Sequence, residues 1–304
     1  MASFTDIIRV LPQYVLPQHT LSHLVFRLAR LEYGPLKNFL IRAFIYIYNV
    51  DMSSAGKPDP ADYRHFNDFF TRDLKPQSRP LTMETGTILC PVDGTVSQIG
   101  DIDNDMILQA KGHEYSLKQL LGGHDHLVRQ FSGGKFACLY LSPKDYHRIH
   151  MPVTGRLKQL IHVPGRLFAV NTHTTRVVDN LFARNERVIS IFETEIGPMA
   201  MIMVGAIFVG SMETVWAGQI TPCEKRNITS INYDKEVIRL QQGAEMGRFN
   251  MGSTVILLFS RDSMAWHQTM VAGRKLLMGE PLGLMGVEAG RPESSRVRGQ
   301  SKNC

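Results

Sequence analysis

The sequence predicts an α+β protein in which N-terminal amphipathic helices precede a β-dominated domain. Apolar residues recur at helical spacing within residues 1–50. From about residue 86 onward the chain instead consists of short apolar runs separated by Gly, Pro, Asn and Asp. The 304 residues, 43% of them hydrophobic and 20% charged, are enough for one large or two ordinary globular domains.

Two helices are predicted in the first 50 residues. The first carries Leu21, Leu24, Val25 and Leu28 on one face. The second begins at Pro35, and its residues 36–48 are apolar almost all round. Such a helix either packs on the core of the domain or lies among lipid headgroups, and its flanking basic residues and tyrosines suit the second environment. The pattern alone leaves both interpretations open.

The β-dominated domain is predicted to span residues 51–286. It opens with a polar linker, 51–62, and a short aromatic helix that carries Phe66, Phe69 and Phe70. Buried strands are predicted at 87–90, 136–141, 187–192, 200–209, 237–240 and 255–259. The longest uncharged stretch, 196–212, is interrupted by Gly and Pro, so we interpret it as buried strands and not as a membrane span. Residues 287–304 are predicted to form a disordered basic tail.

The net charge of +6 is concentrated at the two ends of the chain. Residues 1–50 hold five basic and two acidic residues, residues 287–304 hold four and two, and residues 51–286 are almost balanced. A nucleic-acid partner is therefore not expected, because it would need a basic surface on the main domain. Basic ends suit solvated termini or an anionic membrane surface. Four widely spaced cysteines, and a start interrupted by Asp6 and Arg9, indicate a reducing compartment and no signal peptide.

Three segments carry residues that are capable of chemistry. Asp93 lies in a Pro-Val-Asp-Gly turn, His147 and His150 are three residues apart, and Gly252-Ser253-Thr254 precedes an apolar run. Each segment alone is weak evidence, because Asp-Gly is common in turns and a histidine pair without a third ligand makes a poor metal site. Together they provide the orienter, base and nucleophile of a serine-protease-like site, and no metal is expected.

Several phrases of the chain resemble those of bacterial phosphatidylserine decarboxylases of the membrane-associated type. These phrases are PVDG, DYHRIHMP, VPGRLFAVN, NLFARNERV, ETVWAG and EMGRFNMGST. The resemblance is collinear from about Asp51 to Phe259 and looser over the N-terminal helices. The chain has Met251 where the family usually has Leu before Gly-Ser-Thr, which is a conservative departure.

The resemblance implies a proenzyme that cuts itself between Gly252 and Ser253. The products would be a β-chain, 1–252, and an α-chain, 253–304, with Ser253 converted to a covalent pyruvoyl group. It implies that Ser253 attacks the Gly252 carbonyl, that His150 is the base and that Asp93 orients His150. The mature enzyme would bind the amine of phosphatidylserine to the pyruvoyl group as a Schiff base and release CO2 and phosphatidylethanolamine. His147 would protonate the substrate carbon, or alternatively bind its phosphate or carboxylate.

The implied partners are phosphatidylserine and an anionic membrane, which the protein would bind peripherally on the cytoplasmic side. The two chains would form an α/β pair that assembles further into a homodimer. Two alternatives remain. One is a pyruvoyl-dependent decarboxylase of a soluble amino acid. The other is a non-enzymatic membrane-binding β module in which Gly-Ser-Thr is only a turn.

Overall fold

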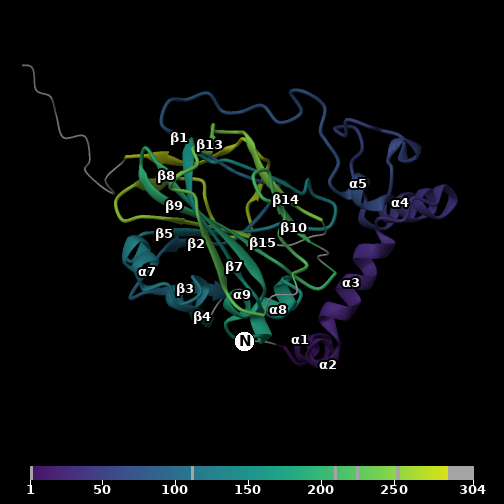
Figure 1. The fold of residues 1–304 in the computed structure, drawn as a ribbon, viewed down its shortest axis with the longest axis horizontal. Coiled ribbons are helices and arrows are strands. Elements are labelled where there is room, and N and C mark those ends of the chain that lie inside the picture. Colours follow the sequence, from purple (N-terminus) through teal and green to yellow (C-terminus); the bar gives the residue numbers. More distant parts are fainter. Residues whose placement is uncertain (1–2, 111–112, 209–210, 224–225, 251–253, 287–304) are drawn as a thin grey trace, which may run out of the picture.

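The computed structural model describes residues 3–110, 113–208, 211–223, 226–250 and 254–286. A β-rich body holds most of the chain, and the N-terminal helices run along one flank of it (Figure 1). This arrangement confirms the predicted α+β class. The predicted tail, 287–304, lies outside the described residues.

Four helices make up the N-terminal segment: α1 (Phe4–Val10), α2 (Pro12–Val15), α3 (Gln18–Leu28) and α4 (Gly34–Tyr48). The side chain of Ser3 accepts a hydrogen bond from the Asp6 amide, and Asp6 in turn accepts from the Ser3 amide, which caps α1. Pro35 lies in the first turn of α4, where its missing N–H costs no hydrogen bond. The two helices predicted from named residues are confirmed as α3 and α4. Helices α1 and α2 also lie within residues 1–50, which were predicted to be helical as a segment, but they had no predicted bounds of their own.

The N-terminal segment contacts the β-rich body at several places. The backbone amides of Ala169 and Leu167 donate to the side chains of Gln13 and Gln18, at 2.8 and 2.9 Å. Helix α1 packs against α8 (Thr172–Val177). Helix α4 packs against α5 (Phe66–Phe70), with the rings of Phe44 and Phe66 5.2 Å apart.

A nine-stranded antiparallel sheet forms the centre of the body. Strand β15 lies between β9 and β5, and all six of its residues are buried. In order across the sheet, the strands are β12 (Thr229–Asn232), β7 (Gly155–Val163), β8 (Arg187–Thr194), β9 (Gly197–Val204), β15 (Thr254–Phe259), β5 (Lys135–Tyr140), β2 (Gly94–Asp101) and β17 (Lys275–Leu276), with β13 (Arg239–Leu240) also paired to β7.

Three smaller sheets surround this centre. The four-stranded sheet consists of β11 (Gly218–Gln219), β10 (Met212–Thr214), β14 (Glu245–Phe249) and β6 (Arg148–His150). The three-stranded sheet consists of β1 (Thr87–Leu89), β18 (Pro281–Met285) and β16 (Met264–Trp266), and the two-stranded one of β3 (Met106–Ala110) and β4 (His113–Ser116). The remaining short helices are η1 (Pro60–Asp62), α6 (Leu117–Leu120), α7 (Asp125–Phe131) and α9 (Leu181–Arg184).

Most predicted strands are present, but two of the predicted ranges are longer than the strands observed. The runs at 87–90, 136–141, 187–192 and 255–259 correspond to β1, β5, β8 and β15. The run at 200–209 ends as a strand at Val204, and only Arg239 and Leu240 of the run at 237–240 pair with a neighbour. The uncharged stretch at 196–212 contributes buried strand, as predicted. Of the helices in the described ranges, none has the length and apolarity needed to cross a bilayer.

Candidate active site

The chemical segments of the sequence meet at one end of the central strand β15. Thr254, its first residue, is opposite Tyr140 of β5 and Val204 of β9, and Tyr140 is also opposite Thr95 of β2. Adjacent strands lie about 4.8 Å apart, so the turn that carries Asp93 is only two strands away from Thr254. The backbone amide of His150 donates to the Pro91 carbonyl at 2.9 Å, which brings the histidine segment to the same place. Gly252 and Ser253 lie outside the described residues, but Ser253 directly precedes Thr254 in the sequence.

The glycine that follows Asp93 is required by this packing. A Cβ atom on Gly94 would lie 2.6 Å from the backbone oxygen of Tyr140, which is closer than a real Cβ contact. Gly94 therefore allows β2 to approach β5 closely and fixes where Asp93 leaves the sheet.

Asp93 is buried and is held by donors other than His150. The Nε atom of Arg79 donates to its two carboxylate oxygens at 2.9 and 3.1 Å, and the Met278 amide donates to Oδ1 at 2.9 Å. This ion pair raises the pKa of the Arg79 guanidinium. Among the described residues, no hydrogen bond joins Asp93 to His150. The orienting role of Asp93 therefore stays a prediction.

His150 is fixed at both ring nitrogens. Its Nδ1 lies 2.8 Å from the Gly243 carbonyl oxygen, and its Nε2 lies 3.0 Å from the Tyr146 hydroxyl. Because a carbonyl can only accept, Nδ1 carries the hydrogen and Nε2 accepts the hydrogen of Tyr146. Burial lowers the pKa of His150, so the ring is neutral at pH 7 and can take a proton at Nε2.

His147 is completely buried next to Phe70, with the two ring centres 4.2 Å apart. Its Nδ1 donates to the Asp145 carbonyl at 2.7 Å, which leaves Nε2 as an acceptor. Nε2 has no hydrogen-bond partner within the described part of the chain. Burial lowers the pKa of His147 to about 3, so this imidazole is neutral near pH 7. In this state it has no proton to give at Nε2 and must first receive one.

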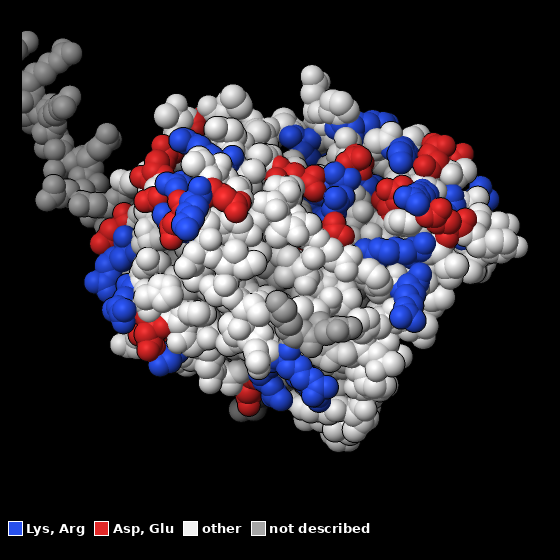
Figure 2. All heavy atoms as spheres, in the orientation of Figure 1, with Lys and Arg blue, Asp and Glu red and all other residues white. Residues whose placement is uncertain are grey.

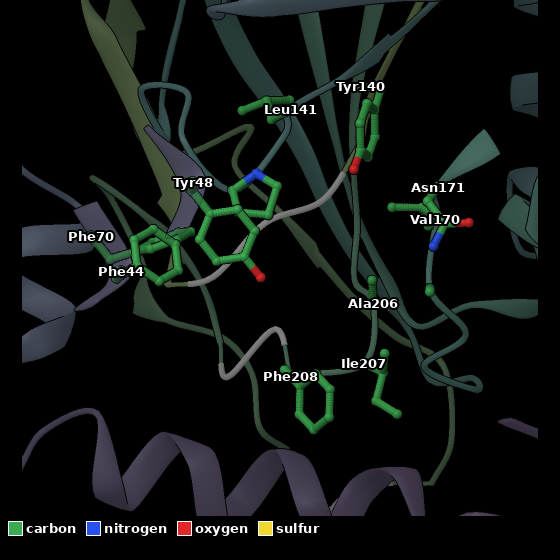
Figure 3. A pocket seen from close by; sticks show the side chains of 12 residues that line it. Phe44, Tyr48, Phe70, Tyr140, Leu141, Val170, Asn171, Ala206, Ile207 and Phe208 are labelled. Carbon is green, nitrogen blue, oxygen red and sulfur yellow. The ribbon is translucent and has the colours of Figure 1, made fainter. Parts of the chain in front are cut away.

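A mostly apolar cavity of about 310 Å³ lies beside the start of β15. Figure 3 shows Phe44, Tyr48 and Phe70 on one side of it, and Tyr140 and Asn171 on the other. Its further lining residues are Leu141, Pro143, Ala169, Val170, Ala206, Ile207 and Phe208. Since Phe44 and Tyr48 belong to α4, the N-terminal segment supplies part of the wall.

Comparison with known proteins identifies the family to which the chain belongs. A family model described as phosphatidylserine decarboxylase matches residues 66–284. The chain belongs to the phosphatidylserine decarboxylase family. A further model, described as PSD, matches residues 8–49.

Members of the phosphatidylserine decarboxylase family resemble the chain over nearly its whole length. A phosphatidylserine decarboxylase proenzyme of Bordetella pertussis is 52% identical over 284 residues, which cover 92% of this chain and 95% of the relative. The proenzyme of Pseudomonas fluorescens is 51% identical over 278 residues (90% and 96%), and that of Stutzerimonas stutzeri is 49% identical over 296 residues (96% and 99%). The predicted family and the prediction of a decarboxylating enzyme, a carboxy-lyase, are thus confirmed.

The structure of this decarboxylase adds residues that sequence reasoning did not assign. Arg79 holds the predicted orienter, Asp93, and Tyr146 and Gly243 hold the predicted base, His150. Tyr146 lies inside the quoted phrase DYHRIHMP, so its position could have drawn attention to it. Arg79 and Gly243 are brought in from other parts of the chain by tertiary contacts alone. Within the described residues, no group of three or more His, Cys, Asp or Glu side chains could hold a metal ion.

Proposed function

We propose that this protein decarboxylates phosphatidylserine to phosphatidylethanolamine with a pyruvoyl group that it makes by cutting itself between Gly252 and Ser253. The observation that supports the proposal is the backbone pairing that brings the segments of Asp93, His147 and His150 toward the end of β15 that Ser253 directly precedes. Membership of the decarboxylase family, whose relatives are named proenzymes, supports the same conclusion.

In the proposed self-cleavage, His150 is the base. Its neutral ring takes the Ser253 Oγ proton at Nε2 while the oxygen attacks the Gly252 carbonyl carbon. Collapse of the adduct breaks the peptide bond, moves the Gly252 acyl group to oxygen and leaves the Ser253 nitrogen as an amine. Loss of the Ser253 α-proton and of the Gly252 carboxylate then leaves dehydroalanine, which tautomerises to an imine. One water molecule hydrolyses the imine, which supplies the ketone oxygen of the pyruvoyl group and releases ammonia. The buried charge of Asp93 favours the imidazolium that forms on His150.

The surroundings of Thr254 fit a small covalent group on the residue before it. The hydroxyl of Thr254 and Nε2 of His147 are both buried without a hydrogen-bond partner among the described residues. The neighbouring cavity is lined mainly by carbon and is shielded by Phe44 and Phe70. A pyruvoyl group supplies a ketone that condenses with the substrate amine and accepts the electrons released with CO2.

His147 is proposed to move the proton that decarboxylation requires. Its Nε2 atom accepts a proton that the substrate ammonium group releases when its nitrogen condenses with the ketone, and returns it to the substrate carbon after CO2 has left. The strongly lowered pKa makes protonated His147 a strong acid, so return of the proton is favourable. Binding of the substrate phosphate or carboxylate by His147 is less well supported, because a neutral acceptor does not attract an anion.

The proposed substrate lies in a membrane, and the N-terminal helices offer a surface that suits one. Large apolar side chains are exposed along these helices: Phe4, Ile8, Leu11, Val15, Leu24, Phe39, Tyr46 and Ile47. The part of this surface formed by α1–α3, at the lower right of Figure 2, is largely uncharged, with basic residues beside it. Such a surface supports peripheral binding to an anionic bilayer.

Widely spaced cysteines, with Cys90 and Cys138 buried as thiols, support a cytoplasmic location. Assembly of the two chains into an α/β pair and then a homodimer rests on the family resemblance.

Mass analysis under denaturing conditions tests the proposed self-cleavage. Purified protein should yield two chains divided between residues 252 and 253, with the smaller chain blocked at its N-terminus. Ser253→Ala should yield one intact chain without decarboxylase activity. An intact wild-type chain after prolonged incubation would exclude a pyruvoyl mechanism.

A separate measurement tests the substrate. Release of CO2 should be rapid from phosphatidylserine in detergent micelles and undetectable from free serine. The opposite preference would assign the chain to the alternative class, the decarboxylases of soluble amino acids.

A further inference from the structure

Arg72 and His147 are two buried side chains that are held by the same two segments of the chain. Nη2 of Arg72 donates to the Lys144 carbonyl at 2.9 Å. Nδ1 of His147 donates to the next carbonyl, that of Asp145, at 2.7 Å. The two residues also lie against consecutive aromatic rings: the Arg72 guanidinium is 5.7 Å from the ring centre of Phe69, and His147 contacts the ring that follows it. The charge of Arg72 is therefore fixed close to the His147 ring.

The positive charge of Arg72 is not neutralised by an ion pair within the described residues. Arg72 is only 5% exposed, and its Nε and Nη1 atoms are buried with no hydrogen-bond partner there. Two carboxylates act on Arg72 from a distance, those of Asp93 and Asp145. Asp93 accepts from Arg79, and Asp145 accepts from the amide and the hydroxyl of Ser142, at 2.7 Å each. Burying an unpaired guanidinium is costly, so a fold that keeps one needs a functional reason.

The protonation of His147 is sensitive to this charge. Burial disfavours the protonated ring most, the hydrogen bond to the Asp145 carbonyl favours it, and the charge of Arg72 disfavours it further. Phe70, which packs against the ring, carries no charge. Asp145 contributes only its carbonyl, because its carboxylate is bonded to Ser142. Within the described part of the chain, Arg72 is thus the charged side chain that acts on His147.

We propose that Arg72 is a positioning residue that keeps His147 an unprotonated acceptor until the reaction begins and makes the imidazolium formed then a strong acid. Arg72 acts through the electric field of its guanidinium, so it needs no bond to His147. Nε2 of His147 takes one proton from the substrate ammonium group, and the nearby positive charge favours return of that proton to the substrate carbon. Arg72 itself stays protonated throughout. This inference rests on the proposed function, because it concerns His147 as the carrier of the proton.

The effect on His147 is tested by nitrogen NMR in the uncleavable Ser253→Ala precursor. With 15N-histidine labelling, and with signals assigned through His147→Gln, the parent should show hydrogen on Nδ1, none on Nε2, and a neutral ring down to about pH 5. Arg72→Met removes the charge and should raise the pH of half-protonation by about one unit or more. Arg72→Lys, which is protonated in this acidic range, is the matched control and should stay within about half a unit of the parent.

Turnover of the mature enzyme separates this role from substrate binding. Arg72→Met should lower kcat for phosphatidylserine by about 3- to 10-fold, because a weaker acid returns the proton more slowly. KM should stay within about 2-fold of the parental value, since the substrate is still bound. A raised KM with an unchanged kcat would show that Arg72 binds the substrate instead, and would overturn the inference.

Three NMR results would also overturn it. Protonation of His147 above about pH 5 in the parent would show that the ring is not kept neutral, and this measurement is decisive even if Arg72→Met folds poorly. Equal curves for the parent and both variants would show that the charge of Arg72 does not reach His147. An equal rise in both variants would show a packing role alone. Normal turnover of His147→Ala would instead contradict the proposed function and leave the difference between the two Arg72 variants measurable.

Discussion

Arg79 donates hydrogen bonds to the Asp93 carboxylate from two nitrogen atoms of its guanidinium group, and both side chains are largely shielded from solvent. Asp93 therefore has its negative charge balanced by Arg79 and not by His150. Removing one member of such a pair leaves a buried charge without compensation, which costs about 3–5 kcal/mol. We expect Arg79→Met to lower the free energy of unfolding by about 3 kcal/mol, measured by urea denaturation in the uncleavable Ser253→Ala background.

The pair of Arg64 and Glu32 provides the control for Arg79→Met. Its side chains are 73% and 54% exposed, so Arg64→Met should cost less than about 1 kcal/mol. Equal losses in the two variants would show that the burial of the Arg79–Asp93 pair has no energetic consequence.

Replacing His147 should separate self-cleavage from decarboxylation. His147 lies beside Phe70, and the proposed mechanism uses it only after the pyruvoyl group has formed. We expect His147→Ala to yield both chains at a near-normal rate and to lower kcat for phosphatidylserine by about 10²–10⁴-fold. The two chains are quantified by mass analysis and the turnover by release of CO2. Normal turnover would exclude His147 from proton transfer.

The burial of His147 also predicts how stability depends on pH. Its pKa is about 3 in the folded protein against an ordinary histidine pKa of 6.5, so between these values the unfolded chain binds a proton that the folded chain does not. The free energy of unfolding should therefore fall as the pH drops below about 6.5, by at most about 1.4 kcal/mol per unit for this group. His147→Gln in the Ser253→Ala background should show a shallower fall, whereas His126→Gln, an exposed histidine, should follow the parent. Parallel curves for all three proteins would contradict the assignment of His147 as buried and neutral.

The sequence predicts the elements of this fold better than it predicts their contacts. The alternation of apolar runs and turn residues located β5, β8 and β15, since each run is long enough to be buried on its own. The paired strands of the four-stranded sheet, such as β10 and β6, are only three residues long, so their patterns carry little information. The predicted site residues were identified from their residue types and from the sequence segments that resemble the family. Their partners were not, because Arg79 and Gly243 reach the site through long-range contacts that no local pattern encodes.

Helix α4 shows why its apolar pattern left two interpretations open, packing on the protein core or lying among lipid headgroups. Ile41 is completely buried, whereas Phe39 and Ile47 are 68% and 70% exposed. The helix packs on α5 with one side and leaves its other apolar side uncovered in this chain. An amphipathic pattern distinguishes polar from apolar faces, but it cannot distinguish protein from lipid as the cover of an apolar face.

If the substrate binds in the cavity beside β15, a larger side chain in the wall of this cavity should lower kcat/KM. Ala169 lines the cavity of about 310 Å³, and a leucine there adds three carbon atoms to the space. We expect Ala169→Leu to lower kcat/KM for phosphatidylserine by at least about 10-fold, because extra methylene groups in a filled site cost about 1–3 kcal/mol. Ala183→Leu, in a different cavity next to Arg187, is the control and should retain parental kcat/KM. If Ala169→Leu also retains it, substrate binds elsewhere.

The exposed apolar side of α4 predicts how the protein binds membranes. Deleting residues 1–50 would be a poor test, because Gln13 and Gln18 are bonded into the β-rich body and Phe44 lines the cavity. We therefore propose the double change Phe39→Ser and Ile47→Ser, which alters only exposed side chains. Full burial of each in lipid contributes about 1.5–3 kcal/mol, so affinity for vesicles of phosphatidylglycerol and phosphatidylcholine should fall at least about 100-fold in a sedimentation assay. Val237→Ser removes a similarly exposed apolar side chain, 78% accessible, from the β-rich body and should bind as the parent does.

The double change Arg27→Gln and Arg42→Gln should instead weaken the salt dependence of binding, since both residues are exposed bases, on α3 and α4. Equal losses for Val237→Ser and the α4 variant would show that the N-terminal helices are not the membrane-binding surface.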